Sequence, residues 1–77
     1  MDDATRYQRE FDILMQEAEA EATRRETADR NAIWHAIEKS FNAVAASANL
    51  SPEQTEDWKR RILDGAVEHF RRNNTDS

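Results

Sequence analysis

Two histidines are the first residues whose chemistry could bind a metal or move a proton. His35 and Glu38 stand three positions apart, a spacing that metal sites in helical bundles use in pairs, together with carboxylates from other helices. The sequence holds one copy of this pair, and no further ligands are evident. His69 lies among apolar residues at helical spacing, where a histidine packed at the edge of a core or interface is the commoner outcome. We therefore expect no metal site and no cofactor.

The remaining residue types give little support for catalysis. Ser40, Ser47 and Ser51 have no histidine at a recognisable spacing, so no activated hydroxyl is indicated. Gly65 is the only glycine, which excludes a glycine-rich phosphate loop. The chain has no cysteine, and therefore no thiolate nucleophile, thiolate metal site or disulfide. We expect that the chain is not an enzyme.

Basic residues gather at 59–61 and 71–72, as they do in some nucleic-acid-binding helices. Acidic residues stand near them on the same predicted helix, mostly four positions away: Glu56, Asp57, Asp64 and Glu68. A solvated face of ion pairs is therefore the better interpretation. Glu53 adds negative charge at the start of this helix, where a DNA-reading helix would meet phosphates. Direct binding of nucleic acid is not expected.

The composition indicates which elements must position these side chains. The chain has 77 residues, 38% hydrophobic and 35% charged, with 11 basic against 16 acidic residues and a net charge of −5. It contains one glycine and one proline, so the turn residues on which β-hairpins depend are missing. We predict an all-α fold, a small bundle of three helical segments at about 3–24, 28–48 and 52–72. We expect residues 1–72 to form a single helical domain and residues 73–77 to form a frayed polar tail.

The clearest helix boundary follows Leu50. Ser51 can cap the first free N–H groups of a helix, and Pro52 suits the first helical position, where a missing N–H costs nothing. Gln54 completes a capping box with Ser51. The pattern predicts a helical hairpin with its turn at 49–52.

The boundary between the first two segments is less defined. Apolar residues follow helical spacing from 4 to 22 and again from 33 to 48, but 23–31 contains neither a large apolar residue nor a helix breaker. Along one continuous helix, the two apolar stripes would point about 110° apart. Either the chain bends near 24–30 and closes a three-helix bundle, or the first two segments form one long bent helix whose halves need different partners.

The last segment has more apolar surface than a single helix contact requires. Its apolar residues cover an arc of about 200°, and a core this small stabilises a fold by only about 3–5 kcal/mol. A homodimer is therefore expected, with a self-sufficient monomer as the alternative. The expected interface residues are Trp34, Trp58, Phe70, Tyr7, Phe11, Ile13 and His69. The two tryptophans could instead pack on each other as the core of the hairpin 33–72.

These observations favour a small, acidic, non-catalytic interaction protein. We expect it to bind and regulate or inhibit a larger protein through an apolar and aromatic helix surface. The alternative is a nucleic-acid-linked regulator, either a dimeric helical transcription factor or an acidic mimic that inhibits a nucleic-acid-binding enzyme. No apolar run approaches the roughly 20 residues of a membrane-spanning helix, and the acidic start Met1-Asp2-Asp3 is unlike a secretory signal. A cytoplasmic location is expected.

Overall fold

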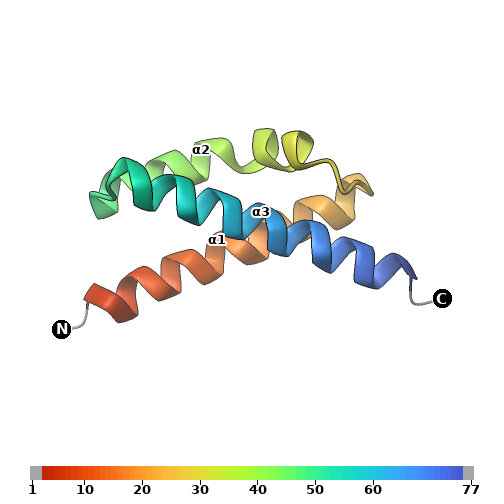
Figure 1. Cartoon of the computed structure of the whole chain (residues 1–77), viewed down its shortest axis with the longest axis horizontal. Helices are drawn as coiled ribbons and strands as arrows, with labels where there is room; N and C mark the ends of the chain where they lie inside the picture. Colours follow the sequence, from red (N-terminus) through yellow and green to blue (C-terminus); the bar gives the residue numbers. More distant parts are fainter. Residues whose placement is uncertain (1–2, 76–77) are drawn as a thin grey trace.

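Three helices make up the part of the chain that the structure describes. The computed structural model describes residues 3–75, which form α1 (Asp3–Arg25), α2 (Arg30–Ala48) and α3 (Pro52–Thr75), without a strand in that range (Figure 1). The predicted all-α bundle of three segments is confirmed. Met1, Asp2, Asp76 and Ser77, including the end of the predicted tail, lie outside the described residues.

A sharp turn separates α1 from α2, so the alternative of one continuous bent helix is wrong. Glu26 adopts a left-handed backbone conformation, with φ of 53°. The N–H of Glu26 bonds to the carbonyl of Thr23, and the N–H of Thr27 to that of Ala22, which is a Schellman ending built without glycine. Asp29 then caps α2, because its side chain accepts a hydrogen bond from the N–H of Asn31 at 3.0 Å. The helix therefore begins at Arg30, two residues later than predicted.

The turn between α2 and α3 has the capping box that the sequence predicts. The N–H of Gln54 donates to Ser51 Oγ at 3.1 Å, and the N–H of Ser51 donates to Gln54 Oε1 at 3.0 Å. Asn49 ends α2 in the left-handed region, with φ of 56°, and Pro52 is the first residue of α3. The predicted hairpin turn at 49–52 is confirmed.

α3 is longer than predicted. It continues through Thr75, three residues beyond the expected end at Arg72, so residues 73–75 of the predicted tail are helical. No glycine or proline interrupts this last turn, and Asn73 Nδ2 lies 3.1 Å from His69 Nε2, one helical turn earlier. The polar composition of these residues was therefore a poor guide to the helix end.

The core lies between all three helices. α1 packs against both other helices and most extensively against α3, while α2 and α3 share the smallest contact. The buried apolar residues are Leu14, Ala18, Ala22, Ile33, Ile37, Phe41, Ile62, Leu63, Ala66 and Val67. The buried residues of α3 form the shared wall, which explains the width of its apolar arc, since one side contacts α1 and the other contacts α2. Much of the apolar surplus expected from the sequence is thus covered within one chain.

α1 and α3 cross near their midpoints, where the chain has its only glycine (Figure 1). A Cβ atom added to Gly65 would lie 2.6 Å from Met15 Sδ and 2.9 Å from Met15 Cε. The missing side chain therefore lets the thioether of Met15 lie directly against the backbone of α3. This close approach sets the crossing point from which the two ends of α1 and α3 diverge.

Polar contacts fix α2 against its neighbours. Tyr7 Oη donates to the carbonyl of Ala48 at 3.2 Å, and Ser40 Oγ donates to Glu17 Oε2 at 3.2 Å, both between α1 and α2. At the other end of α2, Arg30 forms an ion pair with Asp64 of α3. These contacts join both ends and the middle of α2 to the neighbouring helices.

Two isoleucines of opposite exposure test this fold. Ile37 is fully buried in the core, whereas Ile13 on α1 is 52% exposed, the one exposed large apolar side chain within the described residues. We expect Ile37→Ala to lower the free energy of unfolding by about 2–5 kcal/mol, because it leaves a cavity. Measured on the monomer at low protein concentration, Ile13→Ala should change it by about 0.5 kcal/mol or less. Urea denaturation followed by circular dichroism measures both, and equal losses would contradict the exposure of Ile13.

Candidate interaction surface

The seven predicted interface residues fall in separate places. Tyr7, Phe11 and Trp58 meet at one end of the bundle, and Trp34 lies on the opposite side of α3. Phe70 and His69 are half-buried in the second half of α3, and Ile13 stands by itself on the outer face of α1. The structure thus brings three of the seven together and separates the rest.

The group of three forms a concave surface, which we call the aromatic hollow. It lies where the first half of α1, the α2–α3 turn and the first half of α3 meet. Its lining residues are Tyr7, Gln8, Phe11, Leu50, Gln54, Trp58 and Arg61. The rings of Phe11 and Trp58 meet edge to face, with centroids 5.3 Å apart and planes at 84°, a geometry that aromatic pairs favour. The hollow is therefore walled by half-buried rings from two helices.

Hydrogen bonds hold the walls of the aromatic hollow. The bond from Tyr7 Oη to the carbonyl of Ala48 fixes the tyrosine ring against the end of α2. The capping box holds Gln54 through its Oε1 atom, so its amide N–H₂ group takes no part in that bond. Gln8 donates through Nε2 to Asp12 at 3.0 Å. Three lining side chains are thus held by hydrogen bonds within the chain, before any partner binds.

Arg61 brings positive charge to the edge of the hollow. Its Nε atom lies 3.2 Å from Asp57 Oδ2, and Arg60 Nη2 lies 3.5 Å from Asp57 Oδ1. One carboxylate therefore serves two guanidinium groups, and the three side chains carry a net charge of +1. The side chain of Arg61 is 68% exposed, so this charge is accessible to solvent.

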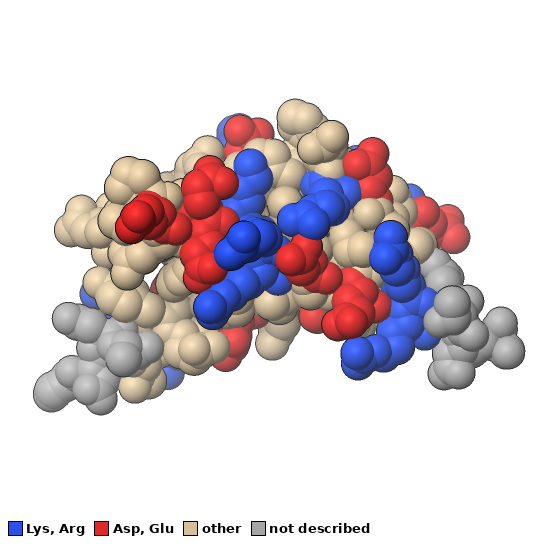
Figure 2. All heavy atoms as spheres, in the orientation of Figure 1, with Lys and Arg blue, Asp and Glu red and all other residues tan. Residues whose placement is uncertain are grey.

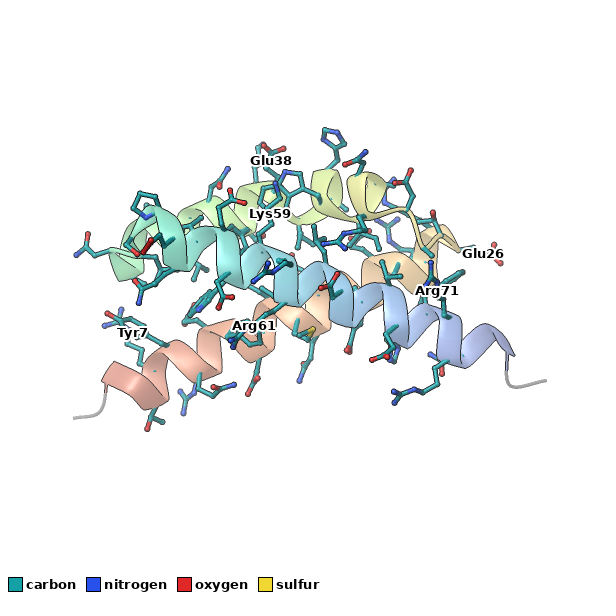
Figure 3. All side chains as sticks on the ribbon, in the orientation of Figure 1. Tyr7, Glu26, Glu38, Lys59, Arg61 and Arg71 are labelled. Atoms are coloured by element: carbon teal, nitrogen blue, oxygen red, sulfur yellow. The ribbon has the colours of Figure 1, made fainter. Side chains whose placement is uncertain are left out.

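The second tryptophan has a different environment. The ring of Trp34 meets that of Phe41 edge to face, with centroids 5.1 Å apart, and Lys59 Nζ lies 4.4 Å from the centroid of the Trp34 ring. The alternative in which the two tryptophans pack on each other is therefore wrong. The two tryptophans lie on different sides of α3. Trp58 lies on the side that faces α1, where it contacts Phe11. Trp34 contacts Lys59, which lies on the side of α3 toward α2 (Figure 3).

The two histidines lie apart from each other and from the hollow. His35 Nδ1 is 3.9 Å from Glu38 Oε1, and both side chains are exposed on α2. Within residues 3–75, no group of three or more His, Asp or Glu side chains is arranged to hold a metal ion. No helix in the same range is long and apolar enough to cross a membrane.

The predicted ion pairing along the surface of α3 is confirmed in part, since Asp57 and Glu68 pair within the helix, whereas Asp64 pairs with Arg30 of α2. Figure 2 shows Lys and Arg side chains alternating with Asp and Glu side chains over the face that carries α3. The pairs on α3 are Asp57–Arg60, Asp57–Arg61 and Glu68–Arg72. On α1, a hydrogen bond from Arg24 lowers the pKa of Glu21, and the positive charge of Arg24 and the contact with Arg25 add to this effect.

Sequence reasoning missed four members of the aromatic hollow as contact residues: Gln8, Leu50, Gln54 and Arg61. The sequence pattern predicts only a helix cap for Gln54 and a solvated charged face for Arg61. The missed signal was the position of Leu50 directly after the left-handed Asn49, where an apolar side chain commonly folds back on the preceding helix.

Comparisons with protein-family models, curated proteins and solved structures found no match to this chain.

The Glu21 interactions give a prediction about pH. Because the pKa of Glu21 is lowered in the folded state, its charged carboxylate stabilises the fold at pH values above its unfolded pKa. This contribution is lost as the pH falls through the folded-state pKa. We expect Arg24→Gln to raise the pKa of Glu21 toward its ordinary value, and Arg25→Gln to raise it less, because the bond from Arg24 is the larger cause. An NMR titration of the Glu21 carboxyl carbon in the three proteins measures this. Equal increases in the pKa of Glu21 in the two variants would contradict the assignment of Arg24 as the larger cause.

Proposed function

We propose that this chain is a small, non-catalytic interaction protein that binds a larger protein through the aromatic hollow. The observation that carries the proposal is the meeting of Tyr7, Trp58 and Arg61 in one concave surface. Tyrosine, tryptophan and arginine are the residue types enriched where single contacts dominate protein binding. The predicted anchors Tyr7, Phe11 and Trp58 therefore act together, and Arg61 joins them.

The partial burial of the hollow supports this assignment. Tyr7, Phe11, Leu50 and Trp58 are all half-buried, so each side chain is partly covered by the protein and partly exposed at the hollow. A side chain that enters such a hollow gains contact with rings whose positions are already fixed, so little conformational freedom is lost. The hollow is small and open, which suits one or two side chains of a protein partner.

Binding at this surface would regulate or inhibit the partner by covering part of its surface, and we place this action in the cytoplasm. The alternative, a nucleic-acid-linked regulator, has weaker support. Glu53, Glu56 and the doubly used Asp57 stand in the first turns of α3, where they would repel phosphates.

A homodimer is the second part of the proposal. Ile13 stands on the outer face of α1 with 52% exposure, one turn after Arg9 and one turn before Glu17. If two copies of α1 pair antiparallel about Ile13, the two isoleucines meet, and Arg9 of each copy comes to the level of Glu17 of the other. Charge complementarity would then fix the direction of the pair.

Partner capture with matched tryptophan variants tests the main proposal. We expect the wild-type chain to retain a specific protein from a native lysate, identified by mass spectrometry, and Trp58→Leu to lose it. Trp34→Leu should retain it, since Trp34 is also half-buried but lies outside the hollow. Circular dichroism melting checks that both variants fold.

Two results would contradict the main proposal. One is loss of the partner with Trp34→Leu but not with Trp58→Leu. The other is capture of nucleic acid in place of protein, weakening steeply with salt, which would favour the alternative function.

Analytical ultracentrifugation tests the homodimer. We expect the wild-type chain to sediment as a dimer at high concentration and Ile13→Glu to sediment as a monomer, because the substitution places two like charges at the centre of the pairing. Ile13→Leu is the control that keeps the apolar contact. A monomeric wild-type chain at all concentrations would refute the second part of the proposal.

A further inference from the structure

We infer that the partner segment held by the aromatic hollow is an acidic peptide segment, in which an apolar side chain enters the hollow and an Asp or Glu beside it pairs with Arg61. The inference rests on the proposed function, because it uses the same surface. It goes further by stating the chemistry of the occupant.

The lining of the hollow supports the apolar part of the occupant. Four of its seven lining residues carry ring or aliphatic side chains: Tyr7, Phe11, Leu50 and Trp58. Polar atoms nevertheless make up the larger share of its exposed surface. The edge-to-face pair of Phe11 and Trp58 forms a wall that an aliphatic or aromatic side chain can contact without desolvating a buried polar group. Within the described residues, no buried side-chain polar atom lacks a hydrogen-bond partner. A polar group at the base of the hollow would therefore find no unpaired buried side-chain atom to bond.

The edge of the hollow supports the acidic part. Arg61 carries the one charge among the lining residues, all of which the structure describes. Its ion pair with Asp57 uses Nε, and Asp57 is shared with Arg60, so that carboxylate does not neutralise Arg61 alone. A guanidinium group binds a carboxylate through two parallel N–H bonds, which favours Asp or Glu over a neutral residue.

The arrangement around α3 indicates that this charge belongs to the hollow. Figure 3 shows Arg61 on the side of α3 toward α1 and Lys59 on the side toward α2. Lys59 lies over the ring of Trp34, so it is occupied elsewhere. Lys59 and Arg61 therefore lie beside different aromatic groups, and Arg61 is the one that lines the hollow with Trp58.

The acidity of the whole chain limits the charge of the partner. A net charge of −5 repels a strongly acidic protein at long range. The carboxylate of the partner must therefore act at short range. It stands within one residue or one helical turn of the apolar side chain that enters the hollow. The competing occupant is a basic segment, which the net negative charge of the chain would attract. At the hollow, such a segment would lie beside the positive charge of Arg61.

A displayed library of random 12-residue peptides, selected on the full chain, distinguishes these occupants. We expect enrichment of peptides with Leu, Ile, Phe or Trp close to Asp or Glu. The best enriched peptide is then labelled, and fluorescence anisotropy measures its affinity for the wild-type chain and its variants.

Arg61→Glu and Arg60→Glu are the matched pair of variants. Both arginines are highly exposed and both contact Asp57, but only Arg61 lines the hollow. We expect Arg61→Glu to weaken binding about tenfold and Arg60→Glu by about twofold or less. A peptide in which Lys replaces the acidic residue should bind Arg61→Glu better than it binds the wild-type chain, a rescue that a general loss of folding cannot produce.

The outcomes separate this inference from the proposed function. Enrichment of basic or uncharged peptides that still require Trp58 would overturn the acidic partner and leave the interaction surface standing. Equal weakening by Arg60→Glu and Arg61→Glu would overturn the pairing with Arg61. If no peptide is enriched on the wild-type chain over Trp58→Leu, both the inference and the proposed surface are refuted.

Discussion

The crossing of α1 and α3 at Gly65 determines how the rest of the molecule is arranged. At this point the thioether of Met15 lies against the backbone of α3, a distance that a Cβ atom would not allow without displacing the thioether. Because the two helices meet near their middles, their ends diverge on both sides of the contact. α2 covers the core along one side of the crossed pair and bonds to α1 through Tyr7 and Ser40. The aromatic hollow lies at one of the divergent ends.

This arrangement explains why a short chain can cover its core and still present an aromatic surface. The buried residues of α3 contact two helices, so most large apolar side chains of the described residues are covered or half-covered within one copy. The accessible surface belongs to rings that already pack against another ring, as Phe11 and Trp58 do. A surface of this kind is rigid, since its ring positions are fixed by the fold, and binding there orders few new groups.

The charged residues have two different consequences. Most ion pairs among the described residues join side chains of one helix, and such exposed pairs contribute little to stability. A few charged residues act between helices or beside an aromatic ring: Arg30 with Asp64, Lys59 over Trp34, and Arg61 at the hollow. For this second group the neighbour in space, which sequence spacing does not identify, decides what the charge does.

The sequence by itself determined the helical class, the three segments and the α2–α3 turn, because helix propensity, apolar periodicity and the capping box of Ser51 and Gln54 act over a few neighbouring residues. Only the tertiary structure decided that 26–29 is a turn, since Glu26 adopts a left-handed conformation that its residue type does not announce. It also decided that Trp58 pairs with Phe11 and Trp34 with Phe41. The angular position of a residue on its own helix is local information, but the helix that faces it depends on how the helices cross.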